Sequence, residues 1–347
     1  MKNRNPYAIS FGKIPNQYIN RDVLINKMID TLDSDVAEEQ AFKLTGIRGT
    51  GKTVTLSALE KNMRQKDRWI VVDLKSNSSI TEDLVANLYS EVPFLMNYID
   101  TSLNLSAFGI GLNLSKKSPI ASIDSALKLL LREIKKRKKR VLVVIDEIRK
   151  TDAIIDFIQE FQILIREDLP IFLMVAGLYD DIENVENSDG LTFFLRATKY
   201  EMTPLNIERI CTNYKETLSL SQEAAFQLAE MTKGYAFAYQ AFGKYMWDFG
   251  EKELTDRVLA QVDETLCEKI YEKIWNELTP LEQDFLRFVV QKESLPAEER
   301  LQVAKHNPRE WMAAKRHLTK KGILEDAHSQ NSILRLPRFK NFLEQIC

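Results

Sequence analysis

The stretch that decides the fold reads Gly-Ile-Arg-Gly-Thr-Gly-Lys-Thr and spans residues 46–53. It satisfies the pattern G-x-x-x-x-G-K-[ST] at every fixed position. An apolar run at residues 41–45 precedes it, and a helix-like stretch at residues 54–63 follows it. The pattern forms a phosphate-binding loop in this strand-loop-helix context. We therefore expect residues 46–53 to cradle the phosphates of a nucleotide.

The residue types in this loop suit phosphate binding. Glycines let the backbone turn tightly and present its N–H groups to phosphate oxygens, and the positive end of the following helix favours the same charge. Lys52 is expected to reach the β- and γ-phosphates, and the Thr53 hydroxyl to ligate a magnesium ion. The alternative, a glycine-rich turn that binds nothing, is disfavoured by this context. The nucleotide-binding residues predicted here are Gly46, Ile47, Arg48, Gly49, Thr50, Gly51, Lys52, Thr53 and Val54.

Composition bounds the class of protein. The 347 residues exceed one ordinary core, so two or three domains are expected. With 48 basic and 50 acidic residues the net charge is -2, which favours neither nucleic acid nor membrane, so any basic surface must be local. The three cysteines lack C-x-x-C spacing and predict reduced thiols rather than disulfides or a zinc site. Without a membrane-length apolar run or a signal-peptide pattern, we expect a soluble cytoplasmic protein with no membrane partner.

Apolar runs recur along the first half of the chain, at residues 69–74, 141–145 and 171–175, with helical patterns between them. This alternation predicts a parallel α/β sheet. Residues 103–114 alternate around a Phe-Gly turn signal and predict an inserted β-hairpin. From residue 205 to 249 the pattern is helical, with a capped helix start at Ser221, and predicts an α-helical lid.

The run at residues 140–145 ends in two carboxylates, Asp146 and Glu147. Acids at the carboxyl end of a strand lie where open α/β sheets bind ligands. In the functional interpretation Asp146 helps to hold magnesium, and Glu147 orients and deprotonates the attacking water. In the alternative both are solvated charges at a helix start. The phosphate-binding loop upstream favours the functional interpretation.

Together these motifs resemble the P-loop ATPases of the AAA+ type, in particular bacterial and archaeal relatives of origin-recognition ATPases that carry a C-terminal winged helix. The resemblance implies ATP and Mg²⁺ as cofactors. It extends to the segment that lines the family's adenine pocket, and it implies that Tyr18 and Ile19 contact the base, although Asn20 replaces the usual glycine. The residues that carry this part are 5–7, 11–12, 15 and 18–22.

Residues 192–196, Thr-Phe-Phe-Leu-Arg, resemble the region that supplies an arginine finger to a neighbouring subunit, with Arg196 as the candidate. The alternative is a surface arginine in a structural ion pair. The chain departs from the family at two sensor positions: residues 175–177 are Val-Ala-Gly, and Phe237 stands at the arginine of G-x-x-R. Both losses remove groups that stabilise charge on the γ-phosphate, so we expect slow hydrolysis, with ATP acting as a switch.

The C-terminal part of the sequence is locally basic. Residues 305–340 hold nine Lys or Arg and three Asp or Glu. The segment resembles a winged helix, with a recognition-type helix at residues 309–321, strands at 323–324 and 333–336, and a wing at 326–331. Trp311, Met312 and Leu318 are predicted to form the helix's apolar side. A basic recognition helix is able to contact the phosphates and the major groove of duplex DNA. The alternatives are a protein partner, since winged helices of the resembled superfamily also pack against proteins, and a charge run that is only a solvated face.

Two further clusters have competing interpretations. The basic run at residues 135–140 is interpreted as a soluble helix end, with a nucleic-acid patch as the alternative. The aromatic residues between 235 and 247 are interpreted as lid core, with a base-stacking platform as the alternative.

The sequence thus predicts an α/β protein with three parts: a parallel-sheet P-loop core of the AAA+ type at residues 1–203, an α-helical lid at 204–265 and a winged helix at 266–347. The favoured function is an ATP-binding switch with slow ATPase activity that associates with duplex DNA through residues 305–340. The alternative is a signalling or assembly ATPase whose winged helix binds protein. Self-association into a homo-oligomer, or a separate protein partner, fits the resemblance.

Overall fold

The computed structural model describes residues 4–9, 15–35, 39–76, 79–95, 122–294, 308–325 and 333–346. The hairpin expected at 103–114 and the wing expected at 326–331 lie outside the described residues. The chain forms two compact units, of which the first comprises Met1–Arg21, Gly46–Gly51 and Met202–Cys347, and the second Asp22–Thr45 and Lys52–Glu201. The first unit thus combines residues 1–21 and 46–51, which were predicted to belong to the core at 1–203, with the chain after Glu201, and the division into three parts stays a prediction. The boundary at residue 265 stays a prediction.

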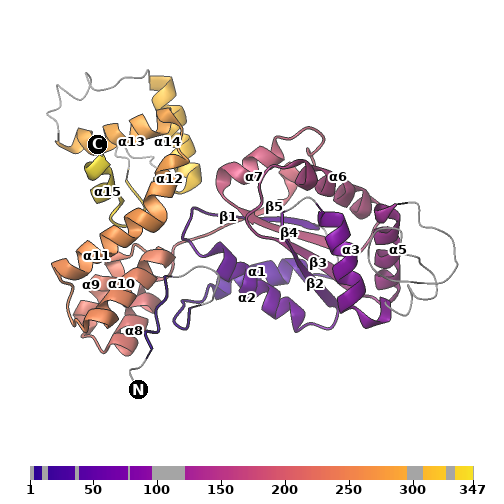
Figure 1. Cartoon of the computed structure of the whole chain (residues 1–347), viewed down its shortest axis with the longest axis horizontal. Coiled ribbons are helices and arrows are strands. Elements are labelled where there is room, and N and C mark those ends of the chain that lie inside the picture. The colour runs from indigo at the N-terminus through magenta and orange to yellow at the C-terminus, as the bar shows by residue number, and fades with distance from the viewer. Residues whose placement is uncertain are drawn as a thin grey trace. The chain divides into compact units, whose positions relative to one another are not determined.

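The second unit is built on a five-stranded parallel sheet in the order β2-β3-β4-β1-β5 (Figure 1). Four of these strands were predicted from their apolar runs, whereas β5 was missed. The parallel sheet and its order confirm the predicted P-loop core. The strands are β1 (Ala41–Thr45), β2 (Trp69–Leu74), β3 (Arg140–Ile145), β4 (Ile171–Gly177) and β5 (Thr198–Glu201).

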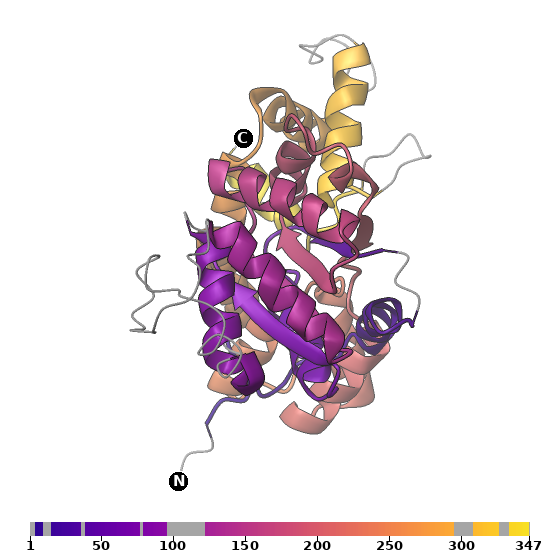
Figure 2. The same ribbon diagram turned by 90° about the vertical axis from the view of Figure 1, so that its right-hand side faces the viewer.

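Helices cover both faces of this sheet, as the two views in Figure 1 and Figure 2 show. Side chains alternate along a strand, so Val141, Val143 and Ile145 of β3 share one core with helices α3, α5, α6 and α7, while Leu142 and Val144 point to the opposite face. Burial on both faces explains the continuous apolar runs. The helices are α1 (Asp22–Leu32), α2 (Lys52–Arg64), α3 (Ile80–Glu91), α5 (Ile123–Lys136), α6 (Asp152–Arg166) and α7 (Tyr179–Glu186).

The first unit is helical among its described residues. Tyr239 and Phe242 lie in its core, which favours the core interpretation of the aromatic cluster, and Ser221 caps the helix that it was predicted to start. The N-terminal segment packs on this unit, since the ring of Tyr7 lies against Gly243. Its helices are α8 (Ile207–Leu218), α9 (Gln222–Met231), α10 (Ala236–Phe249), α11 (Asp256–Leu266), the π-helix η3 (Cys267–Tyr271), α12 (Glu272–Asn276), α13 (Pro280–Ser294), α14 (Pro308–Lys321) and α15 (Phe339–Ile346).

Helices α13 and α14 are joined by a buried charge. Thr279 and Glu282 form a capping box at the start of α13, with distances of 2.7 Å and 3.3 Å between each side chain and the other residue's main-chain nitrogen. Glu282 is buried and pairs with Lys321, at the end of α14, at 2.8 Å. Burial alone would raise the pKa of Glu282, but the bonds from Lys321 and Thr279 outweigh burial and lower the pKa.

The predicted apolar side of α14 is partly wrong. Trp311 stacks on Phe288 with ring centroids 5.3 Å apart, and Leu318 is buried, but Met312 is 63% exposed. Neighbouring helix positions lie about 100° apart, so Trp311 and Met312 cannot both face one core. The two predicted strands after α14 meet in an antiparallel bridge between Leu324 and Leu334.

The basic run at residues 135–140, which extends from the end of α5 to the start of β3, is engaged within the second unit. Lys135 pairs with Asp168 at 2.5 Å, and Arg140 donates to the main-chain oxygen of Ser34 at 2.7 Å. These contacts favour the structural interpretation of the run over a nucleic-acid patch. In the part of the chain that the structure describes, every helix is too short or too polar to cross a lipid bilayer.

Asp33 links the end of α1 to the start of β2, and we expect it to make stability depend on pH. It accepts hydrogen bonds from Arg68 at 2.6 Å and from Lys66 and Trp69 at 2.8 Å each. Burial alone would raise the pKa of Asp33, but these bonds outweigh burial and lower the pKa from 3.8 to about 2.

A carboxylate with a lowered pKa stabilises the fold above its unfolded pKa, and this contribution is lost as the pH falls through the folded value. Asp33→Asn should therefore lower the free energy of unfolding at neutral pH, and its deficit against wild type should narrow between about pH 4 and pH 2. Urea unfolding across this range measures both. Asp35→Asn is the matched control, because Asp35 pairs with the same Arg68 at 3.0 Å but its side chain is 95% exposed. A deficit that does not change with pH would contradict this role of the carboxylate.

Candidate functional site

The loop at Gly46–Gly51 connects β1 to α2 in a conformation that requires its glycines. Gly49 has a φ of 76° and Gly51 a φ of 89°, a region in which side chains are strained. A Cβ on Gly46 would lie 2.8 Å from Met202, and a Cβ on Gly49 would overlap the Tyr235 hydroxyl. Helix α2 starts at Lys52, directly after the loop, so the positive end of the helix dipole lies at Lys52 and Thr53.

The end of β3 supplies the acidic partner of this loop. The Thr53 hydroxyl donates to Asp146 Oδ2 at 2.6 Å, although the two residues are 93 positions apart. The other carboxylate oxygen of Asp146 accepts from the main-chain N–H of Glu147 at 2.9 Å. Glu147 is exposed and has a φ of 52°, a strained conformation that is typical of functional positions. The structure therefore brings Thr53 and Asp146 together as predicted for the magnesium site.

The residues around Asp146 fit a divalent cation. Hydroxyl and carboxylate oxygens are ligands that Mg²⁺ prefers. Two more acids, Glu60 on α2 and Asp73 on β2, belong to this neighbourhood. Burial raises the pKa of both, and repulsion between the carboxylates raises it further. The sequence analysis missed these two residues, although Asp73 lies near the carboxyl end of a predicted strand.

Arg196 lies on an exposed turn that a buried lysine holds. The turn is η2 (Phe194–Arg196), and Arg196 itself is exposed. Lys43 of β1 is 2% exposed and donates to the main-chain oxygen of Phe194 at 2.8 Å and to Glu186 at 2.5 Å. A buried ammonium group needs such partners. The sequence analysis missed Lys43 because its partners lie more than 140 positions away.

The residues predicted at the adenine pocket belong to the first unit. Tyr18 is 37% exposed, whereas Ile19 is partly buried against the core of that unit. Ile47 of the loop packs on the same core. Contact of Tyr18 and Ile19 with adenine stays a prediction.

Three consecutive carbonyl groups of the loop accept hydrogen bonds from other segments of the first unit. The Tyr235 hydroxyl donates to the oxygen of Arg48, and the Phe237 N–H donates to the oxygen of Gly49 at 3.0 Å. Arg21 donates to the oxygen of Thr50 at 2.7 Å and to the oxygen of Thr203 at 2.7 Å. The loop is thus bonded to both the N-terminal segment and the lid.

The side chain of Arg48 has its own partner. Its Nε lies 2.9 Å from Glu277 Oε1, just before α13. This pair is partly exposed, so its contribution to stability is small. The main chain of Arg48 remains the predicted phosphate contact, while its side chain joins the loop to the segment before α13.

The two sensor positions are apolar in the structure as well as in the sequence. Phe237 is 8% exposed and belongs to the core of the first unit. Val175 and Ala176, at the end of β4, are fully buried. Neither position offers a charged or polar side chain to a phosphate.

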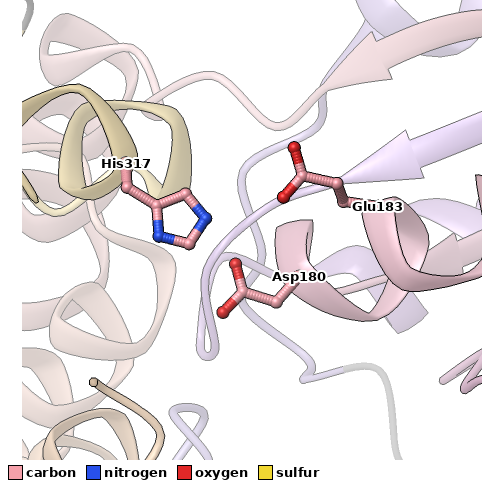
Figure 3. Close-up of side chains that lie close together, drawn as sticks. All are labelled: Asp180, Glu183 and His317. Atoms are coloured by element: carbon pink, nitrogen blue, oxygen red, sulfur yellow. The ribbon is translucent and has the colours of Figure 1, made fainter. Parts of the chain in front are cut away.

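Figure 3 labels three further titratable side chains, Asp180 and Glu183 on α7 and His317 on α14. The first two belong to the second unit and His317 to the first. Within its own unit, Glu183 accepts a hydrogen bond from Tyr179 at 2.8 Å, and His317 Nδ1 lies 2.9 Å from Glu282 Oε1. These contacts give Glu183 and His317 structural roles inside their units.

The glycine loop between β1 and α2, with the acid at the end of β3, defines a P-loop NTPase domain. Comparison with family models agrees, because residues 21–166 match the KAP family P-loop domain. The chain therefore contains a P-loop NTPase domain, as the sequence predicted. No curated protein matches the chain.

Several solved structures are similar to the chain over nearly its whole length. Cdc6p from Pyrobaculum aerophilum has 16% identity and a TM-score of 0.48, with 97% of this chain and 95% of that chain covered. The Orc1 protein of Aeropyrum pernix in complex with DNA has 13% identity and a TM-score of 0.43, covering 95% and 94%. AMPPCP-bound DnaA from Aquifex aeolicus has 14% identity and a TM-score of 0.43, covering 95% and 94%.

The contacts of Lys43 predict a strong effect on stability. Lys43→Met leaves the Glu186 carboxylate without its cation and should lower the free energy of unfolding by about 3 to 5 kcal/mol. Adding Glu186→Gln should recover part of this loss, because no unpaired charge then remains. Chemical unfolding of the single and double variants measures both effects. A loss below about 1 kcal/mol for Lys43→Met would contradict the anchoring role.

Proposed function

We propose that the chain is an ATP-binding switch with slow hydrolysis, in which the loop Gly46–Gly51 and Lys52 hold the triphosphate. The observation that carries this proposal is the 2.6 Å contact between Thr53 and Asp146, directly after the glycine loop. Thr53 and Asp146 would hold Mg²⁺, which when bound neutralises charge on the β- and γ-phosphates. The Lys52 ammonium group binds the same phosphates and orients them.

Glu147 is the residue proposed to act on water. Its carboxylate is exposed at the end of β3, next to the residue that would hold the metal ion, and it can accept a proton from a water placed at the γ-phosphate. Arg196, on its anchored turn, is proposed to contact the nucleotide of a neighbouring copy. In that case full activity requires self-association, which the exposure of Leu195 at 51% beside Arg196 supports.

Slow turnover follows from the two apolar sensor positions. Removing one donor that stabilises transition-state charge costs a factor of roughly a hundred to a thousand in rate. Phe237 and the Val-Ala-Gly end of β4 supply no such donor. A bound ATP would then persist long enough to act as a signal.

The exposed face of α14 supports duplex DNA as the partner. Arg309, Arg316 and Lys320 are exposed and lie at positions that share one helix face, together with Met312. Two more cations of the segment serve the fold, since Lys321 pairs with Glu282, and Arg338 with Asp263 at 2.6 Å. The exposed stripe on α14 fits a row of phosphates.

A protein partner is the second candidate, and Met312 is the observation that favours it. Its side chain is 63% exposed in the middle of the basic stripe, and an exposed methionine suits an adaptable protein contact. In this case the chain is a signalling or assembly ATPase.

The catalytic assignments predict distinct effects of two substitutions. Lys52→Ala should abolish binding of ATP, because it removes the cation that contacts the phosphates. Glu147→Gln should retain binding but stop hydrolysis, because it removes the base. Calorimetric titration with ATP and Mg²⁺ measures binding, and phosphate release measures turnover, which for wild type should stay below roughly 1 per second. Unchanged turnover of Glu147→Gln would exclude Glu147 as the base.

If α14 binds duplex DNA, the salt dependence of the affinity should decrease when cations of the exposed stripe are removed. Wild type should bind duplex DNA with an affinity that falls as salt rises, and Arg316→Ser with Lys320→Ser should reduce the slope of log K against log salt by about two units. Fluorescence anisotropy with and without ATP measures this slope. Lys340→Ser, which removes a cation that pairs with Glu344 on α15, is the control and should keep the wild-type slope. Absent or salt-independent binding would favour the protein partner.

A further inference from the structure

The three bonded carbonyls of the loop suggest how its phosphate-binding face is set. The oxygens of Arg48, Gly49 and Thr50 accept from the Tyr235 hydroxyl, the Phe237 N–H and the Arg21 guanidinium group. We call these three donors the brace. No cis peptide bond occurs among the described residues. In a trans peptide the N–H group points opposite to the C=O group.

Fixing three carbonyls therefore fixes three N–H groups. The planes of these peptides carry the N–H groups of Gly49, Thr50 and Gly51, which belong to the donors that a P-loop presents to phosphates. The Thr50 N–H lies 3.4 Å from the oxygen of Ile47, a long hydrogen bond within the loop that a phosphate oxygen would replace. Without an anion, such N–H dipoles repel one another when they converge. The brace binds the carbonyl edge of each peptide and thereby holds the N–H group at the other edge in place, before any nucleotide arrives.

The donors of the brace are well placed for this task. Tyr235 is 6% exposed, and its hydroxyl occupies the space that a side chain at residue 49 would need. Arg21 bonds two carbonyls at 2.7 Å each, and burial lowers its pKa to about 10, which leaves it charged at neutral pH. Both donors are side chains, so each can be tested by substitution.

We propose that Arg21 and Tyr235 are positioning residues of the nucleotide site, which orient the N–H groups of the phosphate-binding loop through its carbonyls. The proposal rests on the proposed function, because it concerns binding at the same loop. It makes phosphate affinity depend on the docking of the N-terminal segment and of the lid. The lid then acts on the nucleotide through the backbone of the loop. One of its contacts with the loop is made by the main chain of Phe237, the residue that replaces the arginine of G-x-x-R.

The test compares Tyr235→Phe and Arg21→Lys with wild type in binding of ATP, of inorganic tripolyphosphate and of adenosine. Each variant loses one hydrogen bond to the loop, so the Kd for ATP and for tripolyphosphate should rise about five-fold. The Kd for adenosine should not change, because adenosine carries no phosphate. A purely structural role would not separate tripolyphosphate from adenosine in this way.

Two matched controls carry the same substitutions outside the brace. Tyr245→Phe removes a hydroxyl that lies 2.7 Å from the Thr265 hydroxyl, and Arg338→Lys alters a donor that lies 2.6 Å from Asp263. Both should keep the wild-type Kd for ATP and tripolyphosphate. Thermal unfolding of every variant without nucleotide shows which are folded, and either brace variant alone suffices for the comparison.

Hydrogen exchange on the wild-type protein tests the brace without substitution. The Phe237 amide should exchange slowly in the absence of nucleotide, because it bonds Gly49; fast exchange would overturn the proposal. Wild-type Kd values for both brace variants, with binding lost in Lys52→Ala, would also overturn it while the proposed function stands. No ATP binding by wild type would instead reject the proposed function.

Discussion

The function proposed for this chain depends on the orientation of a few peptide planes between β1 and α2. A phosphate-binding loop must converge several N–H dipoles on one point, which is unfavourable until an anion binds. Two glycines with positive φ make the conformation accessible, and bonds to three loop carbonyls hold it. A net contribution of about 1 kcal/mol for each bond suffices to bias a short loop. In the proposed site, the N-terminal segment and residues 235–237 thus contribute to phosphate binding without touching a phosphate.

Charge is distributed unevenly around this loop. Repulsion from the neighbouring carboxylates adds to burial in raising the pKa of Glu60 and of Asp73, and a divalent cation would relieve this repulsion. At the two sensor positions, by contrast, the chain places buried apolar side chains. A site that binds its cation and phosphates but supplies few charges to the transition state favours retention of ATP over rapid turnover.

Cations in the C-terminal part serve two purposes that the sequence does not distinguish. Lys321 neutralises the buried Glu282 and thereby joins α13 to α14, and Arg338 binds Asp263 of α11. Removing either cation would leave its carboxylate partner in a low-dielectric environment without that cation, which is unfavourable. Helix periodicity places three exposed cations on a single face of α14, namely Arg309, Arg316 and Lys320.

The sequence alone determined the elements whose signals are local. Four strands follow from apolar runs, and the phosphate-binding loop follows from fixed spacing, because each depends on neighbours within about ten residues. Asp146 was predicted from its place directly after an apolar run, together with the presence of that loop. Strand β5 was missed because only Tyr200 of its four residues is buried. The roles of Arg21, Lys43 and Tyr235 depend on partners 29 to 187 positions away, so only the tertiary structure could reveal them. The spacing of apolar residues indicates which face of a helix or strand is buried, because it depends only on neighbouring residues. A hydrogen bond between distant segments exists only after the chain has folded.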